Sequence, residues 1–110
     1  MSWSRLIVQS RPVPGREEDY HAWYSGVHLQ EVLTVPGFHS AQRFGLHSVQ
    51  RSSSNPEPPF PFLAVYDIDD DPRTVFDALA AARERLTSTD AVAPDALYHV
   101  WKPLTPRVTR

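Results

Sequence analysis

Hydrophobic and polar positions along this chain change their period several times, and glycine or proline marks most of the changes. The apolar run in residues 3–10 predicts a first strand, which ends before the prolines and glycine of residues 11–15. Alternating apolar side chains predict three further strands over residues 38–46, 60–69 and 96–104. The pattern therefore indicates four strands, separated by two longer segments and one loop.

Each predicted strand divides its side chains between two faces, because successive residues of a strand point in opposite directions. Over residues 38–46 the alternation predicts one face with Phe38, Ser40, Gln42, Phe44 and Leu46, and another with His39, Ala41, Arg43 and Gly45. Over 60–69 it separates Phe62, Ala64, Tyr66 and Ile68 from Leu63, Val65 and Asp67. Over 96–104 it separates Leu97, His99 and Trp101 from Tyr98, Val100 and Lys102. The sequence alone leaves open which face of each strand meets the helices.

The first longer segment, residues 16–35, predicts a helix with an interruption. It opens with four charged residues that include three acids, which favour a helix N-terminus, and it ends at Pro36 and Gly37. Its apolar residues do not form one clean stripe, and Gly26 lies in its middle. We therefore expect a break or kink between Gly26 and Leu29.

The second longer segment predicts a regular helix. Asp71 and Pro72 are typical of an N-cap and a first helical turn. Apolar residues then recur at helical spacing, at Val75, Phe76, Leu79, Ala82 and Leu86. The element order is βαββαβ, which predicts an α+β, ferredoxin-like domain over residues 1–110, with a four-stranded antiparallel sheet and both helices on one face.

The opposite face of this sheet would then have no cover. Apolar side chains are predicted on both sides of the strands, among them Phe38, Phe44, Leu97 and Trp101. Because a continuous exposed apolar patch is rare on a monomer, we expect a second copy of the chain to pack sheet against sheet, giving a homodimeric α/β barrel. Residues 48–59, which are polar and rich in proline, predict an exposed loop.

The composition of the chain limits the classes of function that are plausible. A net charge of −2 and a pI near 6.2 argue against nucleic acid as a partner. The chain has no cysteine, so thiolate chemistry and disulfides are absent. No apolar run has the length of a signal peptide or a membrane span, which makes a cytoplasmic protein the expectation.

The residues that could carry chemistry are concentrated between positions 20 and 44. His28 can take or give a proton near neutral pH without a metal, although it could also simply close the helix by bonding a carbonyl. Tyr24 lies one turn earlier and could share its side of the helix, as a donor to substrate or as core filler. Glu31 could orient the imidazole or cap the second helical piece, and Trp23 could stack on a ligand or pack beneath the helix.

Arg43 could bind an acidic oxygen if its strand face points into a cavity, and it has no role if it faces water. We predict His28, Tyr24 and Arg43 as the catalytic set. Side chains predicted to bind substrate are Trp23, Glu31, His39, Phe44, Tyr66, His99 and Trp101. No pair of histidines and a carboxylate has the spacing of a metal site, and no glycine-rich phosphate loop exists, so no metal and no cofactor are expected.

Two stretches carry a resemblance to a known family. The first reads Pro14-Gly15-x-Glu17-x-x-Tyr20-x-x-Trp23-Tyr24-x-x-x-His28-x-x-Glu31-Val32-x-x-x-Pro36-Gly37-Phe38-x-x-Ala41-x-Arg43-Phe44. The second reads Trp101-x-Pro103-Leu104-x-Pro106-Arg107. Together they resemble the EthD-like branch of the dimeric α/β-barrel superfamily. The resemblance implies a ferredoxin-like dimer, and relatives of this kind include cofactor-free isomerases, lyases and cyclases, quinone-forming monooxygenases and accessory proteins.

These observations favour a cofactor-independent enzyme that acts by acid-base catalysis on a small oxygenated ring compound, such as an aromatic polyketide or a lactone. His28 would move the proton, Tyr24 would donate to a developing oxyanion and Arg43 would hold an acidic oxygen. Two alternatives stay open. One is a cofactor-free monooxygenase of phenols or quinols, and the other is a non-catalytic protein that binds a small molecule.

Overall fold

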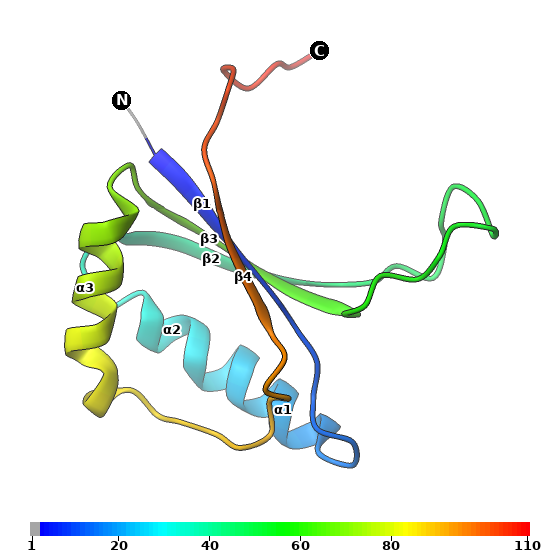
Figure 1. Cartoon of the computed structure of the whole chain (residues 1–110), viewed down its shortest axis with the longest axis horizontal. Helices are drawn as coiled ribbons and strands as arrows, with labels where there is room; N and C mark the ends of the chain where they lie inside the picture. The colour runs from blue at the N-terminus through cyan, green and yellow to red at the C-terminus, as the bar shows by residue number, and fades with distance from the viewer. Residues whose placement is uncertain (1–2) are drawn as a thin grey trace.

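The computed structural model describes residues 3–110, and it has the predicted βαββαβ order (Figure 1). The elements are β1 (Trp3–Ser10), α1 (Glu17–Trp23), a π-helical segment η1 (Tyr24–His28), α2 (Leu29–Val32), β2 (Phe38–Gly45), β3 (Phe62–Asp69), α3 (Pro72–Ala82), a 3-10 turn η2 (Arg83–Arg85) and β4 (Leu97–Trp101). The strands form one antiparallel sheet in the order β2-β3-β1-β4. Figure 1 shows the helices on one side of this sheet. The predicted α+β, ferredoxin-like fold is therefore confirmed.

The predicted interruption of the first helix is a single widened turn. Residues Tyr24–His28 are π-helical and join α1 to α2 without a change in backbone region at either junction. Such one-turn insertions are frequent at functional sites. The Gln30 side chain donates from Nε2 to the Ser25 carbonyl at 3.2 Å, which gives a partner to a carbonyl of this turn.

The core lies between the sheet and the helices. Leu6 and Val8 of β1 alternate with residues on the outer face, and Ala64, Tyr66 and Ile68 of β3 do the same. All five are buried beneath the helices. The predicted division of residues 60–69 between two faces is confirmed, and the strand proper begins at Phe62.

The predicted faces of the second strand are wrong at one position. A register shift between Phe38 and Ser40 places Phe38 on the helix side, where it is buried and lies edge-on to Tyr66. Ala41 and Arg43 share that side, whereas the alternation had grouped Phe38 with the residues of the opposite face. The reason is a β-bulge, which adds one residue to the strand and reverses the faces beyond it. Phe38 therefore does not belong to the uncovered face.

The turn between α2 and β2 explains the Pro36-Gly37 pair. Gly37 has a φ of +96°, a left-handed conformation that favours glycine. A Cβ atom at this position would lie 2.6 Å from Cγ2 of the buried Val75 on α3, which is closer than real contacts allow. Glycine thus lets the chain reverse and lets α3 pack closely against this turn.

The remaining predictions about elements hold in outline. Asp71 caps α3 and accepts hydrogen bonds from the backbone and the side chain of Thr74. β4 is shorter than predicted, and residues 102–110 leave the sheet. Residues 46–61 contain no helix or strand and project from the sheet as a loop (Figure 1). Within residues 3–110 no helix has the length and apolar character to cross a membrane.

Candidate functional site

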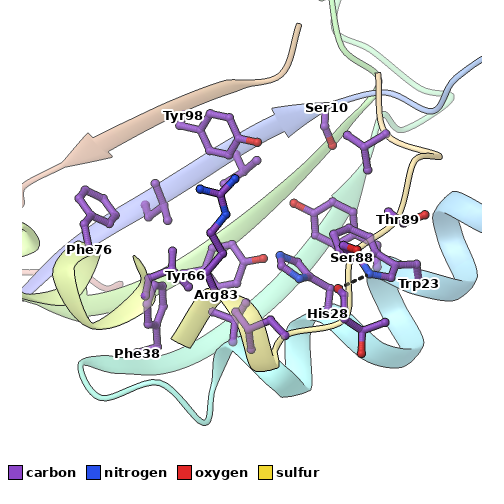
Figure 2. Close-up of a pocket in the computed structure, with 18 residues that line it drawn as sticks. Ser10, Trp23, His28, Phe38, Tyr66, Phe76, Arg83, Ser88, Thr89 and Tyr98 are labelled. Carbon is purple, nitrogen blue, oxygen red and sulfur yellow. Dashed lines mark hydrogen bonds between the residues drawn. The ribbon is translucent and has the colours of Figure 1, made fainter. Parts of the chain in front are cut away.

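A cavity of about 640 Å³ lies between the sheet and the helices (Figure 2). Most of its wall is apolar or aromatic, and its polar side chains include serine, threonine and tyrosine hydroxyl groups. The lining residues are Leu6, Val8, Ser10, Trp23, Tyr24, His28, Val32, Phe38, Tyr66, Phe76, Leu79, Arg83, Leu86, Thr87, Ser88, Thr89, Val92 and Tyr98. Its size and wall suit a small, largely apolar molecule.

Three aromatic side chains of the first helical segment form one ordered array in this wall. The rings of Trp23 and His28 are stacked, with centroids 4.2 Å apart and planes inclined by 19°. Tyr24 lies edge-on to both rings, at 5.2 Å from Trp23 and 5.3 Å from His28. The Trp23 indole is itself fixed, because its Nε1 donates to the Thr87 carbonyl at 2.9 Å (Figure 2). The imidazole is therefore held in a defined orientation.

His28 is both buried and incompletely paired. Its Nδ1 is inaccessible to solvent and has no hydrogen-bond partner within residues 3–110. Burial lowers the pKa of His28 below its ordinary value of 6.5, and the nearby charge of Glu31 opposes this only in part. The imidazole is consequently neutral at pH 7 and able to accept a proton.

Two phenols complete this part of the wall. Burial raises the pKa of Tyr24 to about 12, and burial also raises the pKa of Tyr66 well above its ordinary range. Both side chains are therefore protonated donors at neutral pH. The Tyr66 hydroxyl lies near the Tyr24 hydroxyl but makes no hydrogen bond of ordinary geometry within the described part of the chain. In Figure 2 it points toward the imidazole of His28.

Glu31 has a structural partner. Its carboxylate accepts hydrogen bonds from the backbone N–H of Thr87 at 2.8 Å and from the Thr87 hydroxyl at 3.1 Å. These bonds tie the link after α3 to the first helical segment, next to the Trp23 hydrogen bond. Glu31 does not line the cavity.

Arg43 faces the helix side of the sheet but stands behind the cavity wall. Its guanidinium donates to the Ser25 hydroxyl at 2.7 Å and lies 3.2 Å from Nδ1 of His21. It also lies over the Tyr24 ring, 4.7 Å from the centroid. Arg43 is not among the lining residues, so it contacts Tyr24 rather than the cavity.

The other predicted binding residues lie on the opposite side of the sheet or at its edge. Phe44, His99 and Trp101 are exposed on the face without helices, and Phe44 and Trp101 keep 45% and 59% of their surface. His39 bonds through Nε2 to the Asp69 carboxylate, also at an exposed position. The structure therefore brings Trp23, Tyr24, His28 and Tyr66 together and leaves these four away from the cavity.

Several lining residues were not predicted from the sequence, and one signal could have found part of them. Phe76, Leu79 and Arg83 recur at helical spacing on α3 and its extension, so they share one face. Thr87, Ser88 and Thr89 lie in an irregular link, where no periodic pattern reveals a direction. Among residues 3–110 no group of three histidine, cysteine or acidic side chains is arranged to hold a metal ion.

Comparison with known proteins locates the fold. No protein-family model and no curated protein matches the chain. A putative monooxygenase from Shewanella loihica PV-4 matches with 18% identity, a TM-score of 0.59 and coverage of 100% of this chain and 98% of the other. A dimeric ferredoxin-like protein of unknown function from Thermobifida fusca YX matches with 15% identity, a TM-score of 0.53 and coverage of 93% and 92%.

A protein described as an ethyl tert-butyl ether d (EthD) family protein, from Bacillus halodurans C-125, also matches over its whole length. The identity is 10%, the TM-score is 0.52, and the alignment covers 94% of this chain and 100% of the other. Matches at identities this low show a shared fold only. The chain therefore shares its overall fold with these proteins, one described as a dimeric ferredoxin-like protein and another as an EthD family protein, as the resemblance had implied.

Proposed function

We propose that the cavity binds a small, largely apolar, oxygenated ring compound and that His28 moves a proton on it without a cofactor, in a lyase, isomerase or cyclase reaction. One observation carries the proposal. A neutral, unpaired imidazole stands in the apolar wall beside two protonated phenols, one of which also lacks a partner. Buried polar groups usually have hydrogen-bond partners. Two neighbouring groups without partners suit a ligand that supplies the missing hydrogen bonds.

The chemistry follows from the protonation states. His28 would accept a proton from an acidic C–H next to a carbonyl, and the electron pair would move onto the carbonyl oxygen to give an enolate or phenolate. Tyr24 and Tyr66 can donate hydrogen bonds to that oxygen because both remain protonated. The imidazolium would then return the proton to another carbon, or to a leaving group, so the steps balance without an oxidant.

The aromatic wall supports a flat substrate. Trp23 contributes a ring on one side of the cavity, Phe38 and Phe76 contribute rings on the other side, and Tyr98 adds a ring from β4 (Figure 2). Planar rings stack or meet edge-on with such side chains at little conformational cost.

A monooxygenase is the alternative, and one of the structural neighbours bears that description. An electron-rich phenol or anthrone that loses a proton to His28 could react directly with O₂. Oxidation of anthrone then forms anthraquinone and one water for each O₂ consumed. Oxygen uptake with anthrone, compared with its conversion under nitrogen, separates the two reactions.

A non-catalytic binding protein would bind the same compound and accelerate neither reaction.

The proposed active unit is a homodimer that packs through the faces of the sheets without helices. One neighbour is described as a dimeric ferredoxin-like protein, which supports this assembly. Ile7, Leu63 and Val65 form an apolar centre on that face, and Phe44 and Trp101 flank it on the two edge strands. A second sheet would remove this surface from water.

The test of catalysis is deuterium exchange at C10 of anthrone in D₂O under nitrogen, followed by proton NMR. We expect the native protein to accelerate exchange and His28→Ala to lose about 10²-fold or more of that rate, since general-base catalysis contributes about 10² to 10⁴. His47→Ala, which removes an exposed loop imidazole, should keep the rate. An unchanged rate in His28→Ala, with circular dichroism showing a folded protein, would contradict the proposal.

A further inference from the structure

We propose that Arg83 is the anion anchor of the cavity and that the ligand is therefore an acidic ring compound, with a carboxylate or a comparably acidic oxygen at one end. This inference rests on the proposed function of the cavity as a binding site. It names the class of ligand, and it assigns to Arg83 the part that the sequence had suggested for Arg43.

Arg83 stands where α3 ends and the 3-10 turn η2 begins. Its side chain lines the cavity, and Figure 2 shows it reaching from the helix end toward Tyr98 on β4. The same view shows His28 and Tyr66 beside the Arg83 side chain, on the side away from Tyr98. A ligand in the cavity could thus meet both the guanidinium of Arg83 and the imidazole of His28.

The charge of the cavity is unbalanced. Its lining contains no aspartate, glutamate or lysine, and its histidine is neutral at pH 7, so the guanidinium is the only formal charge among the lining residues. Arg83 is an exposed residue at this cavity. A cation with an apolar wall on one side attracts anions more strongly than a cation that water surrounds on all sides, because the wall lowers the local dielectric. The site should therefore prefer an acid to a neutral compound of equal shape.

Arg83 also differs from the arginines that hold the fold together. Arg5, Arg11 and Arg16 form ion pairs with carboxylates, and Arg85, two residues further on, donates to the Thr34 hydroxyl. Arg83 has no side-chain ion pair or hydrogen bond within residues 3–110. Its five N–H donors, arranged in a planar fork, are free to bind a carboxylate with two parallel bonds.

The experiment compares 2-naphthoate with 2-naphthamide, a neutral compound of the same shape, by isothermal titration calorimetry. We expect the native protein to bind the acid about tenfold more tightly than the amide, as a charge-assisted hydrogen bond pair would give. Arg83→Gln should abolish that preference and leave the affinity for the amide within about twofold. Arg83→Lys should keep part of the preference for the acid, since the positive charge stays but the two parallel N–H donors of the guanidinium are lost.

Arg73→Gln is the matched control, because it removes an exposed positive charge from the other end of the same helix and does not line the cavity. It should keep the full preference for the acid. Equal affinity of the native protein for acid and amide, or an undiminished preference in Arg83→Gln, would overturn the assignment of Arg83 while the cavity remained a binding site. Binding of neither compound would overturn the cavity as a site for ring compounds, and with it both proposals.

Discussion

At the scale of single residues, the site depends on the environment of His28 rather than on the presence of a histidine. The chain has five histidines, and four of them lie outside the cavity lining. Only the stacking of Trp23 and the burial of Nδ1 give His28 a fixed orientation and a lowered pKa. The Trp23 ring is in turn held by the carbonyl of Thr87, 64 positions away, and no local pattern connects these two residues.

The lowered pKa predicts how stability depends on pH. Between the depressed pKa of folded His28 and its unfolded value near 6.5, the unfolded chain binds more protons than the folded one. The contribution of His28 to the free energy of unfolding should therefore be complete above about pH 6.5, and it should be lost as the pH falls below that value. Urea denaturation at neutral pH and near pH 5 should show this loss, and His28→Phe should reduce it.

His47→Phe serves as the control. Because the imidazole of His47 is exposed, replacing it should leave the loss of stability in acid unchanged. His21 shares the same direction of shift, caused first by burial and then by Arg43, so some loss remains in the His28 variant. Identical pH dependence in the native protein and His28→Phe would contradict the buried, neutral imidazole.

At the scale of elements, Asp71, Pro72 and the apolar spacing of residues 72–86 were sufficient to predict α3, because capping and periodicity are local signals. The strand faces were harder. Both faces of the sheet carry apolar residues, and the bulge after Phe38 reverses the alternation without any signal in composition. The same ambiguity left the direction of Arg43 open. Arg43 faces the helix side, where its guanidinium contacts Ser25, His21 and Tyr24.

The link between α3 and β4 is the element on which the cavity depends most, and Glu31 ties it down. Glu31→Ala removes two acceptors from Thr87, so we expect a loss of about 1 to 2 kcal/mol in the free energy of unfolding. Hydrogen exchange measured by mass spectrometry should become faster in residues 86–93.

Glu18→Ala provides the comparison for this prediction, because Glu18 is an exposed acid of α1 remote from the link. It should change neither the exchange of residues 86–93 nor the affinity for 2-naphthoate. Unaltered exchange in Glu31→Ala would mean that the link is held by other contacts.

At the scale of the whole molecule, the fold was predictable because the βαββαβ order admits few antiparallel arrangements with both helices on one face. The position of the cavity was not predictable, because the eighteen residues that line it come from all nine helical and strand elements and from the link after η2. Most of them are ordinary core residue types. The homodimer remains a prediction that follows from the apolar centre of the uncovered face.

Val65 lies at the centre of that face, between Ile7 and Gln42 on the neighbouring strands. Val65→Lys should convert the dimer to a monomer in light scattering coupled to gel filtration, because each copy would bury an unpaired ammonium group in the interface. Val49→Lys, at an exposed loop position, should stay dimeric. A native protein that is already monomeric at micromolar concentration would contradict the proposed assembly.

The central claim, that a neutral imidazole in this cavity moves a proton on a bound ring compound, is tested most directly by the pH profile of anthrone C10 exchange. For the native protein we predict a rate above the uncatalysed background that is level near neutral pH and falls in acid, through a pKa below 6.5, as His28 becomes protonated. His28→Ala should show a flat profile at least about 10²-fold lower. A native profile that matches the background, or one that His28→Ala reproduces, would contradict the account.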